Sequence, residues 1–237
     1  MKTIIAILML SIVVNAALDQ SYLQTIAGDG SSTIVKTQEM NVFSNQLKSG
    51  ALERMANVCQ QGFAVPCSVD QENKKITLTE KLSSNSGYYT LSSDYGFPYI
   101  TYTLTITKIP TDRFSADLDK LLVASDAISS AGGGSAQPIN LNEDNNESVY
   151  YLRKFKANIT YAIKMPAATY EASAGNVSGK RDGSSVTFDL VEVMSTSKPV
   201  IVKSSELNWT YLIIIVAAIS LGGLAITFFT TKPRKRK

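Results

Sequence analysis

The chain has 237 residues, 44% of them hydrophobic, and its 23 basic and 20 acidic residues give a formal net charge of +3. It contains no histidine, which removes the commonest general base, the Ser-His-Asp triad, the Cys-His pair and every His-ligated metal site. No paired-carboxylate motif stands out, although catalysis by carboxylates alone stays open. We therefore expect a non-enzymatic protein with no cofactor and no metal.

The N-terminal end has the pattern of a secretory signal. Lys2 precedes an apolar run from Ile4 to Val14, and the small residues Val14 and Ala16 suit a signal peptidase. We predict a signal peptide over residues 1–16, cleaved after Ala16 or after Ala17. The alternative is an uncleaved anchor, but the run is shorter than the ~20 apolar residues that a span needs.

The C-terminal end predicts a membrane anchor. Residues 209–229 carry no charge, and as a helix they would be roughly 32 Å long, against a hydrocarbon core of ~30 Å. Trp209 and Tyr211 begin this stretch, where amphipathic rings prefer the headgroup region. We expect one transmembrane helix over 209–230, followed by a basic cytoplasmic tail over 231–237. The alternative is a buried core helix.

The excess of basic over acidic residues comes from the two ends of the chain. Removing Lys2 and the five Lys and Arg residues of 232–237 leaves 17 basic residues against all 20 acidic ones. No nucleic-acid partner is implied. The predicted location is the cell membrane, in a single-pass arrangement with residues 17–208 outside and the membrane as a partner.

Two features agree with export. Cys59 and Cys67 are the only cysteines, and an isolated pair in an oxidising compartment is expected to form a disulfide. A metal site is the alternative, but two thiolates without histidine make a poor one. Asn-x-Ser/Thr sequons predict glycosylation at Asn146, Asn158 and Asn176, whereas the sequon at Asn208 lies too close to the predicted membrane.

Alternation and turn signals predict an α+β ectodomain, an antiparallel sheet with two packed helices. The first helix runs from the cap Ser44 to Gly62, the second from Ser115 to Ile128, and the Gly- and Ser-rich residues 129–146 form a flexible insertion. The expected strands are a hairpin of 22–26 and 33–40 around Asp29-Gly30, then 76–79, 99–108, a long strand over 149–165, 186–190 and 199–203.

Strand 99–108 has the clearest pattern. Ile100, Tyr102, Leu104 and Ile106 point to one face, and threonines alternate with them on the other. The threonine face is either a ligand-facing surface or a plain consequence of β-propensity.

Several short motifs occur in order: the Asp29-Gly30 hairpin, Met165-Pro166, Gly175 to Gly179, and Gly183 to Phe188. Their order resembles the LppM-type domain of bacterial and archaeal surface proteins, across nearly the whole ectodomain. Ala167 departs from the glycine often found there, the insertion at 129–146 is extra, and no lipobox cysteine follows the signal. The resemblance implies an α+β fold with an apolar groove and, in some members, lipid binding. It brings no catalytic residues.

The expected function is thus a membrane-anchored surface protein that binds a lipid or an envelope component. The alternative is a structural or adhesion module in a surface protein complex. A lipid site would lie in a candidate apolar groove between sheet and helices, lined by Leu47, Met55, Ile100, Tyr102, Leu104, Ile106, Leu118, Leu122, Phe155, Ile159 and Tyr161.

Overall fold

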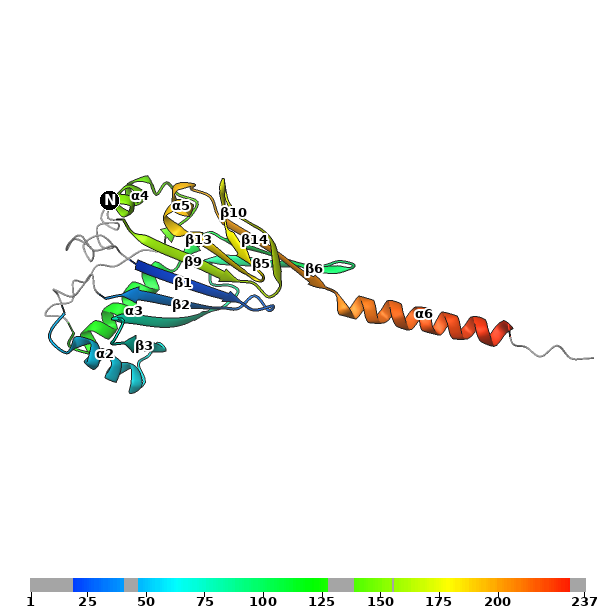
Figure 1. Ribbon diagram of the computed structural model, residues 1–237, viewed down its shortest axis with the longest axis horizontal. Helices are drawn as coiled ribbons and strands as arrows, with labels where there is room; N and C mark the ends of the chain where they lie inside the picture. Colours follow the sequence, from blue (N-terminus) through cyan, green and yellow to red (C-terminus); the bar gives the residue numbers. More distant parts are fainter. Residues whose placement is uncertain (1–18, 41–46, 128–138, 155, 231–237) are drawn as a thin grey trace, which may run out of the picture.

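The computed structural model describes residues 19–40, 47–127, 139–154 and 156–230, with side chains as far as Leu221. The predicted signal peptide 1–16, the cap Ser44 and the tail 231–237 lie outside the described residues. So do Phe155, Ile128 at the end of the second predicted helix, and residues 129–138 of the predicted insertion. Figure 1 shows a folded body from which one long helix projects.

A seven-stranded sheet, called the first sheet below, contains the predicted hairpin. Its order is β12-β13-β9-β1-β2-β4-β3, and the turn between β1 and β2 contains Gly30 in the left-handed region, with φ of +83°. The strands are β1 (Asp19–Ile26), β2 (Ser32–Glu39), β3 (Cys67–Asp70), β4 (Lys75–Leu82), β9 (Asn158–Lys164), β12 (Lys180–Asp182) and β13 (Ser185–Asp189).

The first sheet is mixed, because β1 pairs with β9 in parallel while its other pairs are antiparallel. Parallel neighbours need a long crossover, and here everything from β2 to α4 forms it. Residues 149–165, expected as one strand, are in fact a helix followed by β9.

A five-stranded sheet, the second sheet, is entirely antiparallel, with the order β11-β10-β14-β6-β5. The alternation expected over 99–108 is confirmed, since Tyr102, Leu104 and Ile106 are buried. The strands are β5 (Tyr89–Tyr95), β6 (Tyr99–Ile106), β10 (Ala168–Ala174), β11 (Val177–Ser178) and β14 (Val200–Leu207); β7 (Lys108–Ile109) and β8 (Ile139–Asn140) form a separate pair.

Five helices lie within the described residues: α2 (Ala51–Gln60), α3 (Thr111–Ala124), α4 (Asn146–Lys154), α5 (Leu190–Ser195) and α6 (Trp209–Thr230). The fold is thus α+β with mixed sheets, and the expectation of one antiparallel sheet with two packed helices was wrong. Helix α4 replaces the first part of the expected long strand. Glu147 in its first turn and Arg153 and Lys154 in its last complement the helix dipole, and Lys156 (φ +51°) follows its end.

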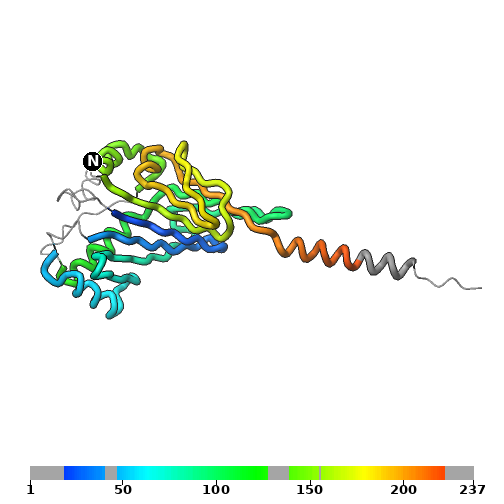
Figure 2. The backbone as a smooth tube through the Cα atoms, viewed as in Figure 1, coloured from blue at the N-terminus to red at the C-terminus, as the bar shows by residue number. Residues whose placement is uncertain are grey.

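One hydrophobic core joins both sheets and the helices of the folded body. Helix α3 covers the inner face of β1 and β2, where the rings of Phe114 and Tyr22 lie 5.7 Å apart. The tube in Figure 2 shows the chain leaving the body along β14 and continuing into α6. The end of the second sheet therefore becomes the root of α6.

The expected transmembrane helix was wrong. Among the residues that the structure describes, no helix is long and apolar enough to cross a membrane. Helix α6 (Trp209–Thr230) occupies the expected place.

Candidate lipid-contact surface

Six exposed apolar side chains gather where the second sheet meets α6. They come from the β5–β6 hairpin, the end of β14 and the start of α6, and they are 40–67% exposed. Figure 1 shows the hairpin extending alongside the junction of β14 and α6. We call them the aromatic cluster: Tyr95, Phe97, Tyr99, Leu207, Trp209 and Tyr211.

Asn208 ties the hairpin to the helix. Its backbone N–H donates to the Pro98 carbonyl at 2.8 Å, and its side-chain amide donates to the Gly96 carbonyl at 3.2 Å. Its side-chain oxygen accepts from the Tyr211 N–H at 3.4 Å, as a helix N-cap does. One buried residue therefore caps α6 and holds the hairpin against it.

Further contacts support this arrangement. Tyr99 pairs with Leu207 across β6 and β14, and the Phe97 and Tyr211 rings meet edge to face at 6.5 Å. Behind the cluster, the Tyr102 hydroxyl donates to Glu206 at 2.8 Å. Burial, together with this carboxylate, raises the pKa of Tyr102 to about 12. The Tyr102 phenol therefore stays protonated and keeps the bond throughout the physiological pH range.

The exposed apolar surface continues along α6. Ile213, Ile214, Val216, Ile219 and Leu221 are each more than half exposed. Monomeric soluble proteins rarely expose contiguous apolar patches larger than a few hundred Å². Together with the aromatic cluster, α6 presents a surface suited to an apolar environment bordered by water.

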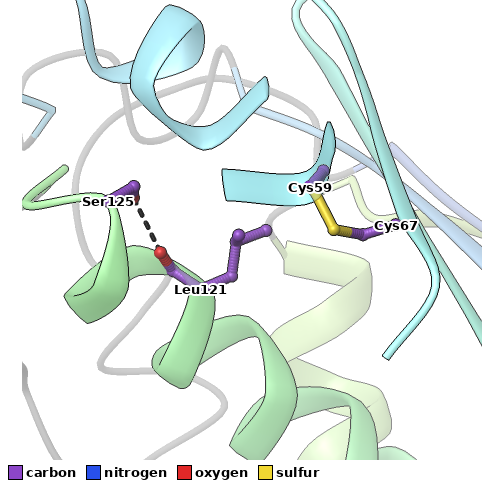
Figure 3. Close-up of a disulfide and its surroundings, with 4 residues drawn as sticks. All are labelled: Cys59, Cys67, Leu121 and Ser125. Atoms are coloured by element: carbon purple, nitrogen blue, oxygen red, sulfur yellow. Dashed lines mark hydrogen bonds between the residues drawn. A yellow bond between two sulfur atoms is a disulfide. The ribbon is translucent and has the colours of Figure 1, made fainter. Parts of the chain in front are cut away.

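The predicted disulfide is confirmed. Cys59, in the last turn of α2, bonds Cys67 at the start of β3, with a Cα–Cα distance of 5.4 Å. Figure 3 shows Leu121 of α3 extending toward this bond, while the Ser125 hydroxyl donates to the Leu121 carbonyl at 2.7 Å. The bridge therefore lies where α2, α3 and the edge of the first sheet meet. Gly62 (φ +99°) follows α2, as its sequence position predicted.

The three predicted glycosylation sites lie in exposed positions. Asn146 begins α4, Asn158 begins β9, and Asn176 lies in the turn between β10 and β11. Asn208 differs, because its side chain is 4% exposed and its amide nitrogen is already bonded. Glycosylation of Asn146, Asn158 and Asn176 stays a prediction. The burial and hydrogen bonding of Asn208 are a structural reason to exclude it as an acceptor.

The residues of the candidate apolar groove lie mainly in the core. Eight are buried and two are partly buried against the core; Phe155 is outside the described residues. The groove itself stays a prediction. The buried residues are Met55, Tyr102, Leu104, Ile106, Leu118, Leu122, Ile159 and Tyr161, and the partly buried ones are Leu47 and Ile100.

A buried lysine is the feature of the interior that sequence reasoning missed. Lys36, on the inner face of β2, is 7% exposed, with Nζ 5.6 Å from the Tyr22 ring centroid and 5.8 Å from that of Phe114. Burial lowers the pKa of Lys36 to about 8. The alternation of β2, in which Ile34 and Gln38 are also buried, was the signal that placed this ammonium inside.

The described part of the chain contains no group of three or more His, Cys, Asp or Glu residues that could hold a metal ion. No protein-family model matches the chain. Searches of curated proteins and of solved structures also gave no match. The resemblance to LppM-type domains therefore stays a prediction.

Proposed function

We propose that this chain is a non-enzymatic protein of the cell surface whose aromatic cluster and α6 bind a lipid surface. The observation that carries the proposal is the convergence of six exposed apolar side chains from three elements, held together by Asn208. Tryptophan and tyrosine favour the boundary between headgroups and hydrocarbon, because their rings have an apolar body and a polar tip. The disulfide supports an oxidising compartment outside the cytoplasm.

A depth measurement tests the lipid contact directly, because Trp209 is the only tryptophan. We expect its fluorescence to shift to the blue when the full chain is added to phosphatidylcholine vesicles. Quenchers attached near the headgroups should act more strongly on it than quenchers at the acyl-chain ends. An unshifted spectrum with undiminished access to a water-soluble quencher would contradict the proposal.

The contribution of the hairpin needs a matched control. Tyr95, in the aromatic cluster, and Tyr150, on α4, have the same exposure of 62%. Tyr95→Ser should weaken vesicle binding and change the Trp209 quenching, whereas Tyr150→Ser should leave both unchanged. Equal effects of the two substitutions would mean that the cluster has no special part in binding.

The second candidate function is a structural or adhesion module that contacts other proteins. The observation that favours it is the open edge of the second sheet along β5, which in the described chain pairs only with β6. Light scattering of the full chain in detergent would test it. A complex larger than one chain per micelle is expected for such a module, and a monomer at all concentrations would count against it.

A further inference from the structure

The two sheets have four edge strands, and three of these are short. Strand β11 has two residues, β12 has three and β3 has four. All three residues of β12 are charged, and β3 carries Asp70 and is tied to α2 by the disulfide. Short length and charge are the usual means by which proteins prevent their sheet edges from pairing with other chains.

The fourth edge, β5, is the least protected: it is long and carries one charged residue, Asp94. It has seven residues, contains neither lysine nor proline, and pairs with β6 without a register shift from Tyr89↔Ile106 to Tyr95↔Ile100. Thr90, Ser92, Ser93, Asp94 and Tyr95 are all exposed. Among the described residues, no backbone bond joins this strand to anything but β6. A straight row of backbone groups is therefore left open on its outer side.

We propose that β5 pairs antiparallel with the β5 strand of a second copy of this chain, centred on Ser92. Asp94 is the only charged residue of the strand. In this register it lies opposite Thr90 of the other copy, whereas in-register parallel pairing would stack Asp94 on Asp94. Like charges directly opposite each other destabilise a sheet, so the charge selects the antiparallel pairing. The two-fold symmetry makes the contact closed and self-complementary.

The pairing fixes how two copies face each other. Strand β5 ends at Tyr95, the first residue of the aromatic cluster. Antiparallel strands therefore place the two clusters at opposite ends of the joined edge. This pairing rests on the second candidate function, a protein-contacting module, and does not require the lipid contact. If both functions hold, two copies join facing lipid surfaces.

Single cysteines test the register, because the described chain contains no free cysteine. Opposed residues have Cβ atoms about 4.5–5.5 Å apart, close enough for oxidative crosslinking. The experiment uses the full chain in excess detergent without vesicles. The Ser92→Cys variant should form a covalent dimer about tenfold faster than the control variant Lys180→Cys, whose cysteine lies on the charged edge β12. Thr90→Cys alone should match that slow control, because its two copies lie roughly 13 Å apart, four residues along the strand.

Mixing two variants completes the test. A mixture of the Thr90→Cys and Asp94→Cys variants should crosslink as a mixed dimer. The Ser92→Lys substitution should remove the dimer seen by light scattering, because it places two ammonium groups opposite each other at the centre of the pairing. Fast self-crosslinking of Thr90→Cys would overturn the antiparallel register. If Ser92→Cys is no faster than Lys180→Cys, or Ser92→Lys still dimerises, β5 is not the interface. A dimer surviving that result would leave the second candidate function standing through another surface.

Discussion

The two sheets place their polar and apolar groups in opposite ways. The first sheet buries polar groups on its inner face, including Lys36, Gln24 and Gln38, and ends in short or charged edges. The second sheet buries mainly apolar side chains, but it has the long uncovered edge β5 and exposed aromatic rings at its end. The first sheet buries polar groups, which costs folding free energy, and its edges are protected from pairing. The second sheet has a mainly apolar interior, but its edge β5 is free to pair. Substitutions in the first sheet should therefore change stability, and those in the second should change binding.

The largest expected effect comes from the disulfide at the edge of the first sheet. Replacing Cys59 and Cys67 by alanine should lower the free energy of unfolding by about 2.5 kcal/mol, because the open chain gains loop entropy. Urea unfolding of the variant and the parent measures this, and Ser68→Ala, an exposed change on β3, is the control. A loss equal to that of the control would mean that the bridge adds nothing to the protection of this edge.

Removing the buried charge of Lys36 should stabilise the protein, in contrast to removing the disulfide. Lys36→Met should raise the free energy of unfolding at pH 7 by about 2 kcal/mol, because the folded state no longer buries an ammonium group, less the lost cation–π contacts. The exposed Lys81→Met on β4 should have almost no effect. A destabilised Lys36→Met variant would show that the two rings compensate fully for burial.

The same lysine predicts a pH dependence. Its pKa is about 8 when folded and 10.5 when unfolded, so between these values the unfolded state binds more protons. The parent should become more stable from pH 8 to about pH 10, and Lys36→Met should not. Above that range the raised pKa of Tyr22 and of Tyr161, both buried, works in the opposite direction. A parent with a flat profile from pH 8 to 10 would contradict the assignment.

Asn208→Ala tests the end of the second sheet, because Asn208 caps α6 and holds the β5–β6 hairpin against it. Loss of the cap should cost about 1 kcal/mol locally, seen as faster hydrogen exchange at the Tyr211 and Leu212 amides. Asn176→Ala, in an exposed turn, is the control. Unchanged exchange at both amides would mean that the hairpin and α6 are held by the ring contact alone.

The smallest effect on stability should come from the open edge itself. Ser92 is exposed, and Ser92→Lys removes only the long bond from its hydroxyl to the Thr103 carbonyl at 3.4 Å, so the free energy of unfolding should stay within about 0.5 kcal/mol of the parent. A thermal melt at a concentration where the chain is monomeric measures it. A large loss would show that the edge of the second sheet is part of the stability network after all, and would weaken the contrast between the sheets.

Local pattern alone determined several parts of this protein. The Asp29-Gly30 hairpin, the glycine after α2, the alternation of β6 and the disulfide pair depend on residues that are near one another in sequence or on cysteines without other partners. The same local reasoning failed at 149–165, where apolar and polar residues alternate as in a strand. There the helix α4 is favoured by charged residues in its end turns and by its packing on α5, and alternation contains neither signal.

Only the tertiary structure decided the rest. The parallel pairing of β1 with β9, the burial of Lys36 under Phe114, and the meeting of the Phe97 hairpin with Tyr211 each join residues far apart in the chain. The sequence analysis predicted neither β5 nor the turn at Phe97, and nothing local states that Asn208 will bond to that turn. Strand pairing and side-chain packing act across space, so the periodicity of a segment indicates which of its faces is apolar and leaves open what that face will meet.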